Sequence, residues 1–101
     1  MKTRFADAAH RELEEAVASY NLERPGLGDQ FRDEVDAALS RIEFWPHAWS
    51  RAGKRARMCR TKRFPYVIVY VPREETIFVL AVMHGHRRPG YWKTRLKDLG
   101  P

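Results

Sequence analysis

The segment "VMHGHRRPGYWKTRL", Val82 to Leu96, concentrates side chains that could do chemistry. It contains two histidines, four cationic residues, one tyrosine and one tryptophan. Histidine titrates near neutral pH, so His84 and His86 could act as a general acid or base. Cationic groups can stabilise the charge that develops on a phosphodiester under attack. The residue types of this segment therefore suit contact with a phosphate group, and they suit docking to a protein equally well.

The charges of the chain are unevenly divided. Residues 7–43 hold ten acidic and four basic residues, whereas residues 44–101 hold three acidic and thirteen basic residues. The whole chain has a net charge of +6. A basic half with interleaved aromatic residues is typical of a surface that meets phosphates. The alternative is a solvated surface whose two halves happen to differ.

Length and composition bound the class of protein. A chain of 101 residues, 44% of them hydrophobic, can form one domain over residues 1–101 with one core. Cys59 is the only cysteine, so we expect neither an internal disulfide nor a zinc site built from thiolates. No stretch is apolar enough for a signal peptide or a membrane span. We expect a cytoplasmic protein without a metal, a cofactor or a membrane partner.

Helical periodicity dominates the acidic half. Apolar residues at helical spacing predict a first helix over residues 8–22 and a second over residues 28–44. The intervening "RPGLGD" carries proline and glycine residues that break helices. Asp29 is expected at the N-cap or in the first turn of the second helix. Pro46 predicts that this helix ends near Trp45.

The basic half shows the pattern of strands. The stretches "ARMCRTKRF", "YVIVYV" and "TIFVLAVMH" predict three strands, and the short "PREE" predicts an antiparallel hairpin between the last two. These two are apolar on both faces, so we expect them in the centre of the sheet, covered by helices or by the terminal segment. "MKTRFAD" could add an edge strand and "GYWKTRLKDLG" a short terminal helix. Trp45 and Trp49 are expected to anchor the core.

These elements together predict the fold class. The order of helices and strands indicates an α+β fold, in which an N-terminal helical hairpin, possibly after a short edge strand, packs on a three- to four-stranded antiparallel sheet. A short C-terminal helix follows the sheet.

The wording and order of several motifs resemble a known family. "YNLERPGLGDQF", "FWPHAW", "KRFPYVIVYV" and "VLAVMHGHRRPGYWKTR" together resemble the RelE/ParE superfamily of type II toxin–antitoxin systems, often called plasmid stabilisation proteins. The resemblance covers nearly the whole chain. It implies a small basic toxin that is neutralised when a segment of a cognate antitoxin wraps over it. RelE-like members cut messenger RNA on the ribosome, whereas ParE-like members inhibit DNA gyrase.

RNA cleavage by a 2′-hydroxyl needs a base, cations beside the phosphate and a donor for the leaving oxygen, but no metal. The resemblance to RelE-like nucleases implies catalytic roles for Arg57, Arg63, Arg87 and Tyr91, to which the titratable His84 is added. Binding of nucleic acid or of a protein target is expected of Arg55, Arg60, Lys62, Arg88, Trp92, Lys93 and Arg95.

Structural roles are open for several of these residues. Arg57 and Arg63 could bind acidic side chains of the helical hairpin or of the antitoxin. His84 could be a hydrogen-bonded residue at the end of a strand. Tyr91 and Trp92 could form a hydrophobic lid that ties the terminal helix to the sheet.

The motif "HGHRRPGYW" departs from RelE-like sequences and is closer to the ParE-like and generic plasmid-stabilisation branch. It favours a toxin that acts on DNA gyrase or another core target. The first alternative is a RelE-like, ribosome-dependent mRNA endonuclease. The second is a non-toxic remnant that binds an antitoxin or nucleic acid.

Overall fold

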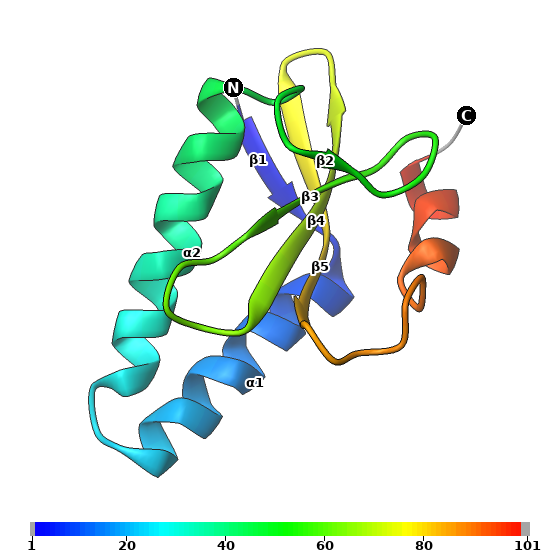
Figure 1. Ribbon diagram of the computed structural model, residues 1–101. Coiled ribbons are helices and arrows are strands. Elements are labelled where there is room, and N and C mark those ends of the chain that lie inside the picture. The colour runs from blue at the N-terminus through cyan, green and yellow to red at the C-terminus, as the bar shows by residue number, and fades with distance from the viewer. Residues whose placement is uncertain (1, 100–101) are drawn as a thin grey trace.

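The helices and strands follow the predicted order, including the optional N-terminal edge strand, and one further strand of two residues lies at the other edge of the sheet. The computed structural model, shown in Figure 1, describes residues 2–99. Its elements are β1 (Lys2–Phe5), α1 (Asp7–Glu23), α2 (Leu27–Phe44), β2 (Ser50–Arg51), β3 (Arg57–Arg60), β4 (Tyr66–Arg73), β5 (Thr76–His84) and the 3-10 helix η1 (Lys93–Leu99). The α+β fold is confirmed, and no helix among residues 2–99 is long and apolar enough to cross a membrane.

The sheet differs in detail from the expected antiparallel one. Its five strands lie in the order β1-β5-β4-β3-β2, and β1 runs parallel to β5 while the other neighbours are antiparallel. The parallel pair arises because the chain leaves β1 through the helical hairpin and returns beside it only with its last strand. β2 is only two residues long and polar, so it carries no alternation that a sequence pattern could reveal.

The helical hairpin turns tightly because of one asparagine and two glycines. The side-chain oxygen of Asn21 accepts hydrogen bonds from the backbone N–H groups of Gly26 at 3.1 Å and Gly28 at 2.7 Å. Gly26 has a φ of 90°, which favours glycine. A Cβ at Gly28 would lie 2.1 Å from the backbone oxygen of Val17, so only glycine lets the two helices approach this closely. Asp29 lies in the first turn of α2, as expected.

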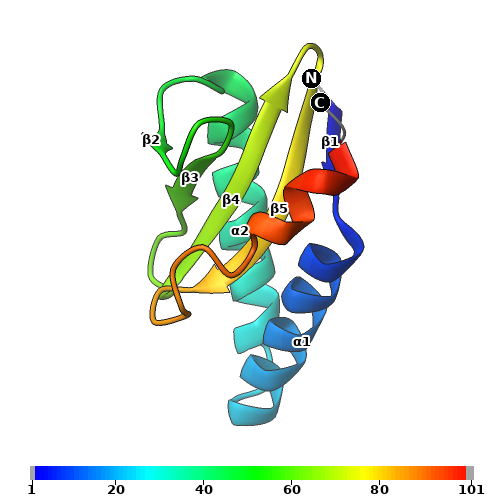
Figure 2. The same ribbon diagram turned by 90° about the vertical axis from the view of Figure 1, so that its right-hand side faces the viewer.

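Both faces of the sheet are covered. The helices pack on one face through apolar side chains at helical spacing, namely Ala9, Leu13, Ala16, Val17, Phe31, Val35, Ala38 and Ile42. The segment that follows β5 covers the opposite face, where Trp92 is 5% exposed and packs with Val69, Val71, Leu80 and Ala81. Figure 2 shows η1 on one side of the sheet and α2 on the other. The expected burial of both central strands is thus confirmed.

The two tryptophans near the end of α2 behave differently. Trp49 packs against the core and donates its indole N–H to the backbone oxygen of Arg41 at 3.3 Å. Trp45 is 57% exposed and lies against Phe44, which is 77% exposed, with ring centroids 4.8 Å apart. The expectation that Trp45 anchors the core is therefore wrong. Trp45 is the C-cap residue of α2, and its ring packs on Phe44 at the exposed end of the helix.

Candidate functional site

The candidate site lies where strand β5 outruns its neighbour β1. The parallel pairing ends at Phe5 opposite Val79, because the chain then turns into α1. β5 continues to His84, and a β-bulge in its pairing with β4 occurs at the same level, between Val69 and Tyr70. Backbone groups of β5 beyond Val79 therefore need partners other than β1, since unpaired backbone groups are costly when buried.

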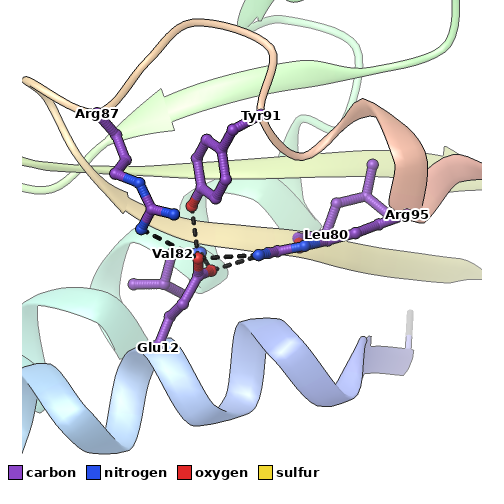
Figure 3. A network of polar contacts seen from close by, with 6 residues as sticks. All are labelled: Glu12, Leu80, Val82, Arg87, Tyr91 and Arg95. Atoms are coloured by element: carbon purple, nitrogen blue, oxygen red, sulfur yellow. Dashed lines mark hydrogen bonds and ion pairs between the residues drawn. The ribbon is translucent and has the colours of Figure 1, made fainter.

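Side chains from α1 and η1 supply those partners. The Glu12 carboxylate accepts a hydrogen bond from the backbone N–H of Val82 at 3.0 Å. The Arg95 guanidinium donates to the backbone oxygen of Leu80 at 2.7 Å and binds both carboxylate oxygens of Glu12 at 3.0 and 3.1 Å. Figure 3 shows this arrangement. One carboxylate thus joins α1, β5 and η1.

Two residues of the loop after β5 complete the network around Glu12. The Tyr91 hydroxyl donates to Oε2 of Glu12 at 2.6 Å, and Nη1 of Arg87 lies 4.0 Å from the same oxygen. The guanidinium carbons of Arg87 and Arg95 lie 4.0 and 5.0 Å from the centroid of the Tyr91 ring. We call Glu12, Arg87, Tyr91 and Arg95 the Glu12 network.

The Glu12 network is mostly shielded from water, with side-chain exposures of 14% for Glu12 and 18% for Arg95, while Arg87 is 55% exposed. Burial raises the pKa of Tyr91, and the hydrogen bond to Glu12 raises it further. The hydrogen bond to Glu12 likewise raises the pKa of Arg95. At neutral pH the Tyr91 phenol is therefore protonated and donates a hydrogen bond to Glu12. A phenol in this state is poorly suited to act as a base.

A hollow adjoins the network on the β1 side. It has a volume of about 710 Å³ and is lined by Arg4, Phe5, Arg11, Leu80 and Arg95, among others. Apolar, cationic and acidic side chains border it, the acidic ones being Asp7 and Asp98. This combination suits a side chain or an extended segment of a protein partner.

The other predicted catalytic residues lie on different elements. Arg57 donates to the backbone oxygen of Trp49 at 2.8 Å, in the loop before β2. Arg63, which has a φ of 70°, donates to the side-chain oxygen of Gln30 on α2 at 3.1 Å. His84 accepts a hydrogen bond at Nδ1 from the backbone N–H of His86 at 3.1 Å. Among residues 2–99, Arg57 and Arg63 have neutral hydrogen-bond partners and no acidic ones.

The residues that were predicted to bind nucleic acid or a protein target also lie at several separate sites. Arg60 and Lys62 border a groove of about 610 Å³ beside β3, together with Arg41 and Trp49. Arg55 borders a different pocket, near β2. Arg88 and Lys93 are exposed, and Trp92 is buried in the core, as its alternative role as a lid requires. Of the predicted residues, the structure gathers Arg87, Tyr91 and Arg95 around one carboxylate.

Sequence reasoning missed Glu12, the centre of the network. Glu12 lies in "RELEEA", where it is one of several acidic residues on α1 and follows the helical pattern of a solvated face. Nearby Glu14 has that ordinary role, since it pairs with Arg32 of α2 at 2.8 Å across the exposed side of the hairpin. No signal in a single sequence separates these two glutamates.

Between residues 2 and 99, no three His, Cys, Asp or Glu side chains lie close enough together to bind a metal ion.

Comparisons with known proteins give the family. The family model described as ParE toxin of type II toxin-antitoxin system, parDE, matches residues 3–89. Among solved structures, the chromosomal ParDE toxin–antitoxin system from P. aeruginosa is similar in fold, with a TM-score of 0.72 and 12% identity over 83% of this chain and 95% of that one. No curated protein matches the chain. This protein belongs to the ParE toxin family of type II toxin–antitoxin systems.

Proposed function

We propose that this chain is a toxin that arrests bacterial growth by acting on DNA gyrase, and that a cognate antitoxin neutralises it. The observation that carries the choice of target is the distribution of the predicted catalytic residues. Arg87 and Tyr91 are tied to Glu12, whereas Arg57 and Arg63 bind partners on other elements. A toxin that acts by binding a protein does not need its arginine and tyrosine side chains to converge on a single atom of the target.

RNA cleavage makes a stricter demand. Base, cations and acid must surround a single phosphodiester, because the rate depends on holding them in reacting geometry. Here the Tyr91 proton is already engaged by Glu12. Val69, Val71 and Ala81, on the sheet face that η1 covers, are apolar and buried. These features favour binding of a protein target over phosphodiester cleavage.

The region after β5 is suited to contact such a target. Arg87 is 55% exposed although it belongs to the Glu12 network, and Arg88 beside it is exposed. The hollow on the β1 side of the network, which Arg95 also lines, adds a recess with apolar, cationic and acidic side chains. Arginine and aromatic side chains around a recess are typical of the residues that carry binding energy between proteins.

The groove beside β3 is suited to the antitoxin. Arg41, Arg60 and Lys62 supply cationic groups, and Trp49 and Met58 supply apolar surface. β3 pairs with β2 over only two residues, Arg57 and Met58, so the rest of its outer edge is not covered by β2. An acidic, amphipathic segment would neutralise the cations and cover the apolar surface together.

The decisive experiment induces the chain without antitoxin in a bacterial host and follows growth, chromosomal DNA breaks and transcript ends. We expect growth arrest with gyrase-dependent breaks and intact transcripts, and inhibition of purified gyrase that is relieved by the antitoxin. Cuts within translated codons would instead identify an mRNA endonuclease. Normal growth with abundant folded protein would identify a non-toxic member of the family.

A matched pair of variants tests the contact region. Arg87→Ala should weaken growth arrest, because it removes an exposed guanidinium from the loop after β5. Arg24→Ala removes the same charge from the exposed end of α1 and should leave toxicity unchanged. Equal toxicity of the two variants would show that the loop after β5 is not the contact.

A further inference from the structure

A further cationic site, distinct from the groove beside β3, lies near β2 and the end of β4, away from the Glu12 network. It is a pocket of about 270 Å³ lined by the cationic or titratable residues His47, Arg51, Lys54, Arg55, Arg57 and Arg73. Val71 and Pro72 add an apolar part to the lining, and none of the lining residues is acidic. We call it the basic pocket.

Local backbone structure holds these cations together. The backbone N–H of Ala52 donates to the oxygen of Ala56 at 2.8 Å, which closes the loop between β2 and β3. Gly53 has a φ of 115° and makes the turn at its tip. The loop thereby presents Lys54 and Arg55, both exposed, beside the end of β4.

Three of the four arginines that line the basic pocket are held by backbone oxygens instead of carboxylates. Arg57 donates to the oxygen of Trp49 at 2.8 Å, Arg51 to that of Lys54 at 3.2 Å, and Arg73 to that of Leu99. None of the ion pairs found among residues 2–99 involves a cation of this pocket. A carbonyl orients a guanidinium without cancelling its charge, and it leaves further N–H donors for another acceptor. The pocket therefore presents oriented, uncompensated positive charge.

An exposed aromatic pair stands just before the pocket in the chain. Phe44 and Trp45 lie against each other with exposures of 77% and 57%, and His47 of the pocket follows two residues later. The Tyr70 hydroxyl donates to the backbone oxygen of Pro46 at 2.7 Å, which fixes this segment to the sheet. The exposed aromatic pair therefore precedes the first residue of the pocket, His47, by two to three residues of chain, and within residues 2–99 it packs against no residue of the core.

We propose that the basic pocket binds the phosphate backbone of a single-stranded nucleic acid, and that Phe44 and Trp45 stack on its bases. Arginine forks match phosphate oxygens, and exposed aromatic rings beside a cationic groove are the usual means of holding unpaired bases. An acidic protein segment would explain the cations, but it would not need the exposed aromatic pair. This site is separate from the Glu12 network and does not depend on which target the toxin inhibits.

The test measures binding of a fluorescent single-stranded oligonucleotide to the full chain by anisotropy at several salt concentrations. Affinity should fall steeply as salt rises, because bound cations release counterions from the strand. Lys54→Ala and Arg55→Ala should each lower the slope of log K against log salt by about 0.7, which is about fivefold in affinity at 0.1 M salt if counterion release carries the whole effect. Arg24→Ala is the control with the same loss of charge.

Three outcomes decide the proposal. Lys54→Ala and Arg55→Ala variants that bind like Arg24→Ala would overturn it, because the attraction would then come from net charge alone. Displacement of the strand by poly-glutamate at equal charge concentration would also overturn it, in favour of an acidic protein partner. Trp45→Ala should weaken binding of the single strand more than binding of the matching duplex, and equal losses would overturn the stacking role.

Discussion

The Glu12 network and the basic pocket both gather arginines, but their arginines have opposite partners. In the network, Arg87 and Arg95 meet a carboxylate that is shielded from water. In the pocket, Arg51, Arg57 and Arg73 donate to backbone oxygens. A buried carboxylate neutralises the positive charge of its arginine partners and stabilises the fold. Carbonyl partners fix the side chains and leave the charge for a ligand. Counting cations along the chain does not distinguish these two uses.

The largest expected effect comes from removing the carboxylate. Glu12→Ala leaves the N–H of Val82, the hydroxyl of Tyr91 and the guanidinium of Arg95 without their common partner, so we expect a loss of about 3 kcal/mol in the free energy of unfolding. Urea denaturation measures it. Glu14→Ala is the control. The side chains of Glu14 and Arg32 are 43% and 40% exposed, so their ion pair should contribute less than about 1 kcal/mol to stability. Equal losses would contradict the special role of Glu12.

The next largest effect compares the loss of a hydrogen bond to a charged acceptor with the loss of one to a neutral acceptor. Tyr91→Phe removes a hydrogen bond to a carboxylate and should cost about 2 kcal/mol, whereas Tyr70→Phe removes one to the Pro46 carbonyl and should cost about 1 kcal/mol. Both changes keep the aromatic ring. Thermal and urea unfolding of the two variants give the comparison, and a larger loss in Tyr70→Phe would go against it.

Alkaline pH should weaken the fold through the same two tyrosines. Burial raises the pKa of Tyr70 from 10.0 to about 12, and the pKa of Tyr91 is also raised. Because the folded protein favours the neutral phenols, their contribution is complete below pH 10 and is lost as pH rises from there through the folded pKa values. Stability measured from pH 8 to pH 12 should fall above pH 10. The fall should be shallower in Tyr70→Phe, and an unchanged slope would contradict the assignment.

The smallest effect on stability is expected in the basic pocket. Arg55→Glu places a carboxylate among uncompensated cations and so imitates the Glu12 network. Since Arg55 is exposed, the free energy of unfolding should change by less than about 0.5 kcal/mol. Oligonucleotide binding should weaken more than in Arg55→Ala. If Arg55→Glu left oligonucleotide binding unchanged, the basic pocket would not offer its positive charge to a ligand, and it would not differ from the Glu12 network in this respect.

Much of the fold could be predicted because its signals are local. The helices begin and end within one residue of the expected 8–22 and 28–44, since apolar spacing and the proline and glycine breakers act over short stretches. The two central strands were recognisable from their apolar runs. β2 and the parallel place of β1 were not, because a two-residue strand has no pattern and the pairing of an edge strand is set by the route of the chain.

The candidate site, too, was predicted only in part from the sequence. The sequence by itself determined that cations and aromatic residues cluster after the last strand, and its motifs indicated the toxin family. Only the tertiary structure decided that Glu12 collects Arg87, Tyr91 and Arg95, while Arg57 and Arg63 bind elsewhere. The physical reason for the Glu12 network is that Glu12 and Arg95 meet backbone groups of β5 that have no strand partner once β1 ends at Phe5. Residue types show what a side chain can do, and the packing of elements distant in sequence decides what it meets.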